Sequence, residues 1–197
     1  MPFKFSTMII PDVVLIEPKI FSDSRGLFVE LFKASEFQAN NVPAAFVQVN
    51  HSRSQKNALR GLHYQLNPKA QAKLISVVRG EIFDVAVDIR RGSPAYGQWA
   101  AENLSETDKR MLFIPEGFAH GFCVLSDMAE IIYYCSREYA PESERTILWN
   151  DPAIAVPWPV KVPLLSAKDS KGSLLSDVEN NFEYRFPPVK GMTMSKG

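Results

Sequence analysis

The sequence is poor in the residues that build disulfide frameworks and most metal sites, because its 197 residues include only 2 cysteines and 3 histidines. Cys123 and Cys135 have no metal-ligand spacing, and two thiols without a disulfide pattern are typical of a reducing cytoplasm. Their spacing leaves a bridge between them open. The chain also lacks net charge, since 22 basic residues balance 22 acidic ones, so we expect no nucleic-acid or anionic-membrane surface. Any anion site must therefore be local.

Long apolar runs and nucleotide-binding glycine motifs are missing as well. Residues 1–16 are interrupted by prolines and charges, which makes them neither a signal peptide nor a membrane span, so we expect a cytoplasmic protein. The chain contains no glycine fingerprint for a dinucleotide, which fits chemistry without a redox cofactor. A length of 197 residues and a hydrophobic content of 46% predict one globular domain over residues 1–197.

Short runs rich in β-branched and aromatic residues recur about every ten residues, with Gly or Pro between them. Residues 73–78 and 82–89 are predicted to pair as a hairpin around Gly80, residues 27–32 to form a strand and residues 34–40 a short helix. This pattern predicts an all-β antiparallel sandwich or barrel with a few short helices. We expect its core over about residues 12–170, and a poorly ordered or partner-docked tail over residues 177–197.

One histidine has the surroundings of a proton carrier. His63 follows Arg60 by three residues and precedes Lys73 by ten, and we expect these charges to lower its pKa. With an ordinary pKa of about 6.5 it would be a base at neutral pH, beside fixed positive charge for an anionic substrate. The alternative is an ordinary half-buried strand residue.

Apolar and polar residues alternate over residues 47–50, so Gln48 and Asn50 share one strand face. This polar face is informative about function if it lines the inside of a barrel.

A second segment, Pro115-x-Gly117-x-x-His120, resembles the second motif of cupins, in which a turn delivers a histidine into the mouth of a small β-barrel. Metal-binding cupins carry His-x-His in the first motif, whereas this chain has His63-Tyr64-Gln65. An amide is a poor ligand for a transition metal, so we expect a cupin-type jelly-roll barrel without a metal. Gln65 therefore disfavours a metal-dependent cupin dioxygenase or isomerase.

Six segments together resemble one family of metal-free cupins, the dTDP-4-dehydrorhamnose 3,5-epimerases, over about residues 12–170. They are Phe21-x-Asp23-x-Arg25-Gly26-x-Phe28-x-Glu30, Gln48-x-Asn50-His51-Ser52, Arg60-Gly61-Leu62-His63-Tyr64-Gln65, Asp84-Val85-Ala86-Val87-Asp88-Ile89-Arg90, Ile114-Pro115-x-Gly117-Phe118-Ala119-His120-Gly121-Phe122 and Ser166-x-Lys168-Asp169. The resemblance implies inversion of C3 and C5 of a dTDP-linked 4-keto-6-deoxy sugar on the route to dTDP-L-rhamnose, for polysaccharide biosynthesis. Inversion of C3 alone, or another nucleotide sugar, stays open. A non-catalytic nucleotide-sugar-binding cupin is a more distant alternative.

Epimerisation beside a ketone needs a base, a positive group near the enolate oxygen and an acid on the opposite face. The resemblance implies that His63 is the base, that Asp169 orients it and that Lys73 stabilises the enolate. It also implies that Tyr133 is the acid. Because neighbouring strand residues face opposite ways, only Tyr133 or Tyr134 can point into the barrel, and the family pattern selects Tyr133.

The resemblance also implies the residues that bind the nucleotide sugar, with Arg60 gripping the diphosphate and Tyr139 stacking on the pyrimidine. The implied set is Arg25, Glu30, Gln48, Asn50, Arg60, His120, Tyr139, Glu144 and Lys168. Glu144 and Lys168 have the alternative of being plain surface charges. Members of the family form homodimers, and residues 3–10 have the composition of an edge strand exchanged between subunits. Arg25 or Glu30 would then complete the partner's pocket.

Overall fold

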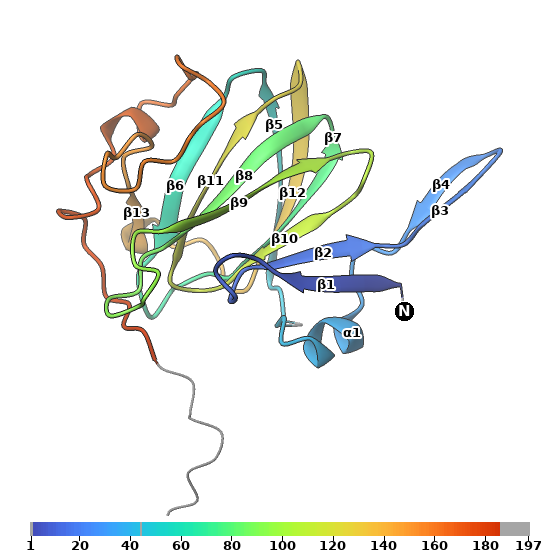
Figure 1. Cartoon of the computed structure of the whole chain (residues 1–197), viewed down its shortest axis with the longest axis horizontal. Helices are drawn as coiled ribbons and strands as arrows, with labels where there is room; N and C mark the ends of the chain where they lie inside the picture. Colours follow the sequence, from blue (N-terminus) through green and yellow to red (C-terminus); the bar gives the residue numbers. More distant parts are fainter. Residues whose placement is uncertain (1, 44, 186–197) are drawn as a thin grey trace, which may run out of the picture.

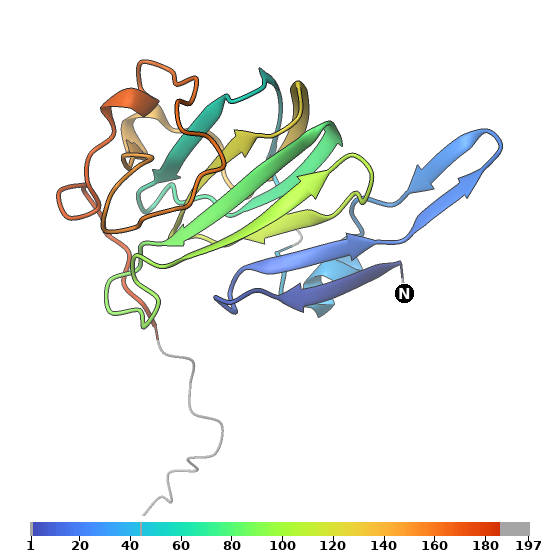
Figure 2. The ribbon, with the colours of Figure 1, turned by 45° about the horizontal axis from the view of Figure 1, so that its top comes forward.

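Two antiparallel sheets face one another in the computed structural model, which describes residues 2–43 and 45–185 (Figures 1 and 2). In order across the first sheet, the strands are β1 (Phe3–Thr7), β2 (Val14–Pro18), β10 (Met111–Ile114), β7 (Lys73–Arg79), β12 (Met128–Cys135) and β5 (Gln48–Gln55). Across the second sheet, they are β13 (Glu144–Thr146), β6 (Leu59–Gln65), β11 (Phe118–Val124), β8 (Glu81–Asp88) and β9 (Trp99–Ser105). The prediction of an all-β antiparallel fold is confirmed.

Side-chain alternation along each strand separates the core from the outer faces. Ile75 and Val77 of β7 point between the sheets, where they pack against Ile131 of β12 and Phe122 of β11. Leu74, the residue before Ile75, packs on the opposite face of the same sheet. Because β-branched and aromatic side chains suit this half-buried pleated surface, the sequence folds here as strands.

Each sheet is covered on its outer face. The helix α1 (Ala34–Ala39) buries Phe37 against Phe3 of β1, with the two rings 5.2 Å apart and almost perpendicular. The chain after β13, which includes the 3₁₀ turn η2 (Asp169–Lys171), crosses the five-stranded sheet. There Phe182 packs against Tyr64 of β6. None of the helices in the described part of the chain has the length and apolar content needed to cross a membrane.

Three expectations from the sequence need correction. The strands on either side of Gly80 do not pair, because β7 lies in the six-stranded sheet and β8 in the five-stranded sheet. The strand expected over residues 27–32 is shorter, and β4 (Gly26–Val29) instead pairs with β3 (Ile20–Asp23) as a hairpin that projects from the barrel (Figures 1 and 2). Of the expected tail, residues 177–185 pack on the domain itself, where Phe182 is buried, and residues 186–197 lie outside the described residues.

The N-terminal segment lies within its own chain. β1 pairs with β2 over five residues, from Phe3 opposite Pro18 to Thr7 opposite Val14. Phe3 is buried beneath α1. Residues 3–7, which belong to the segment expected to exchange between subunits, thus form the edge of the six-stranded sheet, and the β3–β4 hairpin is the element that projects from the body.

Candidate functional site

Two adjoining cavities between the sheets form one cleft. The first, here called the Tyr139 lobe, has a volume of about 320 Å³, and the second, the Arg60 lobe, about 270 Å³. The residues common to both walls are His63, Lys73, Tyr133 and Glu144. Gln48, Asn50 and Tyr139 line only the first lobe, and Arg60, His120, Lys168 and Asp169 only the second. Eleven of the thirteen residues chosen from sequence thus meet in one cleft.

His63 and Asp169, expected to touch although they are far apart in sequence, lie in contact. His63 Nε2 lies 2.6 Å from Asp169 Oδ1, although the ring is not aimed well enough for a regular hydrogen bond. The carboxylate is fixed from other directions, because Ser166 Oγ donates to Oδ2 at 2.6 Å and the Gly61 amide donates to Oδ1 at 3.2 Å. Asp169 can therefore hold its position while the imidazole changes its protonation state.

Burial sets the charge state of this pair. Burial lowers the pKa of His63, and the nearby ammonium groups of Lys168 and Lys73 lower it further, while Asp169 opposes them. The expected direction is therefore found, but its main cause is desolvation rather than neighbouring charge. Burial alone would raise the pKa of Asp169, yet interactions with His63 and Ser166 bring it down to about 2. At neutral pH the site holds a neutral imidazole beside a carboxylate.

A bulge in β6 brings Arg60 to the same face as His63, although an odd spacing normally puts residues on opposite faces. His63 lies opposite His120 and Arg60 opposite Phe122, so β6 has one residue more than β11 between these pairs. Gly61 makes this possible. Its φ is +117°, and a Cβ at this position would lie 2.5 Å from Gly121 Cα.

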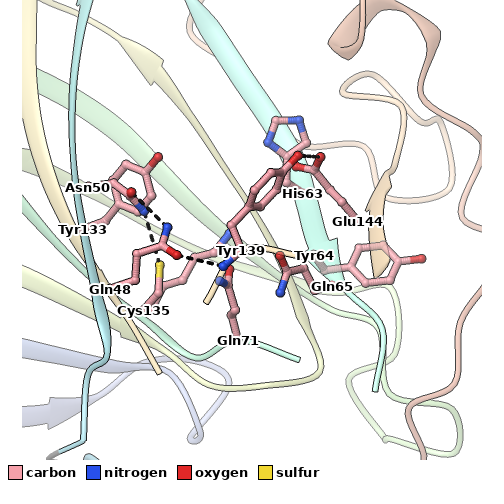
Figure 3. Close-up of a pocket in the computed structure, with 11 residues that line it drawn as sticks. Gln48, Asn50, His63, Tyr64, Gln65, Gln71, Tyr133, Cys135, Tyr139 and Glu144 are labelled. Carbon is pink, nitrogen blue, oxygen red and sulfur yellow. Dashed lines mark hydrogen bonds between the residues drawn. The ribbon is translucent and has the colours of Figure 1, made fainter. Parts of the chain in front are cut away.

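Tyr133 enters the cleft from the six-stranded sheet, opposite the β6 strand that carries His63 (Figure 3). Lys73, on β7 of the same six-stranded sheet, also lines the cleft. Burial lowers the pKa of the Lys73 ammonium and raises the pKa of the Tyr133 phenol. Neither side chain makes a hydrogen bond or an ion pair with any other residue in the described part of the chain. Tyr134, as alternation requires, points away and packs against Phe46.

The remaining polar residues form one connected set that runs through Tyr139. Gln48 Nε2 donates to Asn50 Oδ1 at 3.0 Å, and Gln48 Oε1 accepts a hydrogen bond from the Tyr139 amide at 2.8 Å. On the other wall, Glu144 accepts a hydrogen bond from the Tyr139 hydroxyl at 2.8 Å and forms an ion pair with Lys168. Glu144 and Lys168 are thus cleft residues rather than plain surface charges. Figure 3 shows Asn50 and Tyr133 on one side and His63 and Glu144 on the other.

His120 carries a second carboxylate contact, since its Nε2 lies 2.7 Å from Asp84 Oδ1. Gln65, which stands where metal-binding cupins have a histidine, uses its amide nitrogen to donate to the carbonyl oxygens of Lys69 and Glu138. In the described ranges no three His, Cys, Asp or Glu side chains come together as a metal site. Cys123 and Cys135 are both buried free thiols.

Comparison with known proteins matches residues 7–177 to the family model described as dTDP-4-dehydrorhamnose 3,5-epimerase. The epimerase of that name from Shigella flexneri is 55% identical over 171 residues, which are 86% of this chain and 94% of the relative. The chain belongs to this family. The prediction of an epimerase made from the six motifs is thereby confirmed.

Solved structures of family members have the same fold. The dTDP-6-deoxy-D-glucose-3,5-epimerase of Legionella pneumophila, in complex with dTDP-4-keto-L-rhamnose, gives a TM-score of 0.90 at 46% identity, covering 93% of this chain and all of that one. The cupin-type barrel is thereby confirmed. ChmJ of Streptomyces bikiniensis, a 3'-monoepimerase in complex with dTDP-quinovose, gives 0.81 at 36% identity over 86% of this chain and 87% of that one. A relative from Neisseria gonorrhoeae is 51% identical over 92% of this chain, which spans about half (55%) of that relative's length.

Two residues that the family resemblance places in the site do not reach it within one chain. Arg25 lies at the tip of the β3–β4 hairpin, where it bonds to Asp23, and Glu30 follows β4 without lining either lobe. Sequence reasoning also missed cleft residues. Alternation from Tyr133 points to Cys135 and alternation from Asn50 points to Ser52, while the Ser166-x-x-Asp169 spacing points to the serine that holds the carboxylate.

Proposed function

We propose that this protein inverts C3 and C5 of dTDP-4-dehydro-6-deoxy-D-glucose to give dTDP-4-dehydro-L-rhamnose, without a metal or cofactor. The observation that carries the proposal is the entry of His63 and Tyr133 into one cleft from opposite sheets, with Lys73 beside them. A base and an acid on opposite walls are what inversion at carbon requires. The names and substrates of the relatives described above support the same chemistry.

The proposed mechanism is proton removal and return on opposite faces of the sugar ring. His63 takes the proton from the carbon next to the ketone, and the C–H bonding electrons move into the enolate. Asp169 stabilises the imidazolium that forms. The Lys73 ammonium stabilises the negative charge on the enolate oxygen. The Tyr133 hydroxyl then donates a proton to the carbon from the other face. Once His63 has released its proton to solvent and the Tyr133 phenolate has taken one up, the same steps invert the second carbon.

Binding of the nucleotide sugar is assigned to the polar residues of both lobes. We propose that Arg60 and Lys168 contact the diphosphate and that Tyr139 stacks on the pyrimidine, since its side chain is half exposed at the rim. Gln48, Asn50, His120 and Glu144 then contact the sugar or the base. The same proposal places the enzyme in the cytoplasm, where buried free thiols such as Cys123 stay reduced.

We further propose a homodimer in which Arg25 and Glu30 complete the partner's cleft. The β3–β4 hairpin projects from the body and exposes three large apolar side chains, Phe21 at 47%, Leu27 at 55% and Phe28 at 65%. Apolar side chains gathered on a projecting hairpin are typical of a surface that another subunit covers.

Complementation between subunits tests this arrangement. Arg25→Ala and His63→Asn are each expected to be nearly inactive, and co-refolding the two variants is expected to restore activity. One cleft of a mixed dimer would then hold both His63 and an intact Arg25 from the other subunit. If Arg25 served its own subunit, every cleft would carry a defect, and no activity would return.

Turnover in deuterated water tests the reaction itself. With dTDP-4-keto-6-deoxyglucose as substrate, deuterium is expected at both C3 and C5. Label at C3 alone would favour a monoepimerase such as ChmJ, the second candidate, which the fold similarity supports. No label, with dTDP still bound, would indicate a nucleotide-sugar-binding protein instead.

A further inference from the structure

Buried polar atoms without a partner gather at one end of the cleft. Within residues 2–43 and 45–185 three side-chain atoms are of this kind: Ser52 Oγ, His63 Nε2 and Asp84 Oδ2. Ser52 and His63 line the Arg60 lobe, and Asp84 lies behind His120, which lines it too. Nearly all buried polar groups in proteins are hydrogen-bonded. Because Ser52 and His63 line the Arg60 lobe, a molecule bound in that lobe can reach both atoms.

Among these three atoms, only Ser52 Oγ belongs to a side chain with no polar contact elsewhere in the described residues. His63 Nε2 lies 2.6 Å from Asp169 Oδ1, and the other oxygen of the Asp84 carboxylate, Oδ1, contacts His120. The Ser52 hydroxyl has no such contact. Its cross-strand neighbour is Ile131, whose apolar side chain cannot accept a hydrogen bond.

Ser52 continues the polar inward face of β5. Along this strand, Gln48, Asn50 and Ser52 are partly buried, while the residues between them are exposed. Ser54, the next residue on the face, accepts a hydrogen bond from Arg60 Nε at 3.0 Å. That bond holds the guanidinium at the lobe that Ser52 also lines, and it leaves the two terminal nitrogens without a partner in the part of the chain that the structure describes.

We propose that Ser52 is a further substrate-binding residue, whose hydroxyl donates a hydrogen bond to an oxygen of the nucleotide sugar in the Arg60 lobe. The inference rests on the proposed function and extends its binding site along β5. The acceptor is an oxygen beside the Arg60 guanidinium, either a non-bridging diphosphate oxygen or an oxygen of the sugar ring. Both accept a hydrogen bond in the same way.

The proposal has an unusual consequence for stability. A serine that supports the fold loses a hydrogen bond when it is changed to alanine, and the protein becomes less stable. Ser52→Ala removes a buried hydroxyl that the free protein leaves unpaired, so the unfolding midpoint is expected to stay the same or to rise. Affinity for the ligand is expected to fall about tenfold, since the ligand oxygen would then be the unpaired atom.

The experiment compares the full chain with Ser52→Ala and with Ser105→Ala. Ser105, on β9, is also partly buried, but its hydroxyl bonds to Thr107 and lies outside both lobes. Three quantities are measured for each: the dissociation constant for dTDP, KM for dTDP-4-keto-6-deoxyglucose, and the urea midpoint. Ser105→Ala is expected to keep both ligand constants.

Weaker dTDP binding by Ser52→Ala would support the proposal and place the acceptor on the diphosphate. A raised KM with unchanged dTDP binding would support it and place the acceptor on the sugar. The proposal is overturned if both constants stay within twofold of the original protein, or if the midpoint falls together with affinity. Deuterium exchange by the unaltered protein is a separate readout, so a failure of the epimerase assignment is distinguishable from a failure of the Ser52 assignment.

Discussion

Replacement of Asp169 by asparagine is the sharpest test of the proposed base. The carboxylate raises the proton affinity of His63, whereas burial and two ammonium groups lower it. Without the negative charge, the pKa of His63 should fall further below its ordinary value. Because the base must be unprotonated, the acidic limb of the pH–rate profile is expected to move to lower pH. The rate on the plateau should fall about 10⁴-fold, as in other enzymes where a His–Asp pair loses its carboxylate.

The same replacement is expected to lower the stability of the folded protein, by an amount that follows from the pKa of Asp169. The pKa of Asp169 is about 2 in the folded protein, against an ordinary value of 3.8. A folded pKa below the unfolded one means that the ionised carboxylate stabilises the protein above pH 3.8, and that this stability is lost as the pH falls towards about 2. The difference corresponds to about 2 kcal/mol, which Asp169→Asn should forfeit at neutral pH.

Asp151→Asn is the matched control for this test. Asp151 is also a buried carboxylate that accepts two backbone hydrogen bonds, from Ala153 and Leu175, but it lies outside both lobes. It should lower the urea midpoint and leave the acidic limb in place. An Asp169→Asn enzyme with an unmoved acidic limb and a plateau within tenfold of the original would refute the assignment of His63 as the base.

Four further predictions follow from the same cleft. His63→Asn should abolish deuterium exchange at both carbons and leave dTDP affinity nearly unchanged; retained exchange would mean that another group is the base. Tyr133→Phe should permit some exchange but impair inversion, and equal loss of both would count against its role as the acid. Gly61→Ala should destabilise the protein by about 3 kcal/mol in urea titration, because a Cβ would lie 2.5 Å from the backbone of β11. Gly92→Ala, which meets nothing within 4 Å, should cost only about 1 kcal/mol. Treatment with EDTA should leave activity intact, since Gln65 is held by backbone carbonyl oxygens; loss of activity would indicate a metal.

The alternation of side chains along the strands predicted several features of the fold and of the cleft from the sequence. The alternation around Asn50 predicted that Gln48 and Asn50 share one strand face, and in the structure both side chains line the cleft. The same rule required that only Tyr133 or Tyr134 point inward, and the family pattern selected Tyr133. Periodicity failed at Gly80, because a tight glycine turn looks the same in sequence whether its two strands pair or enter different sheets. Which sheet each strand joins depends on contacts far along the chain.

Residue spacing in the sequence also did not predict features that depend on the three-dimensional structure. Arg60 and His63 share a face only because β6 bulges at Gly61, and an odd spacing in sequence argues against it. The contact of His63 with Asp169 was predicted from the family resemblance, because no residue near His63 in the sequence indicates a partner so far along the chain. The burial that dominates the pKa of His63 is likewise a property of the folded cleft.

The origin of Asp169 in the segment after the last strand has a consequence for assembly. β13 ends at Thr146, so every strand of both sheets comes before Asp169 in the chain. A nascent or truncated chain that stops between these points contains the residues of all the strands and His63, but it lacks the carboxylate that contacts the imidazole. The proposed proton-carrying pair is therefore complete only after every strand of this molecule has been synthesised.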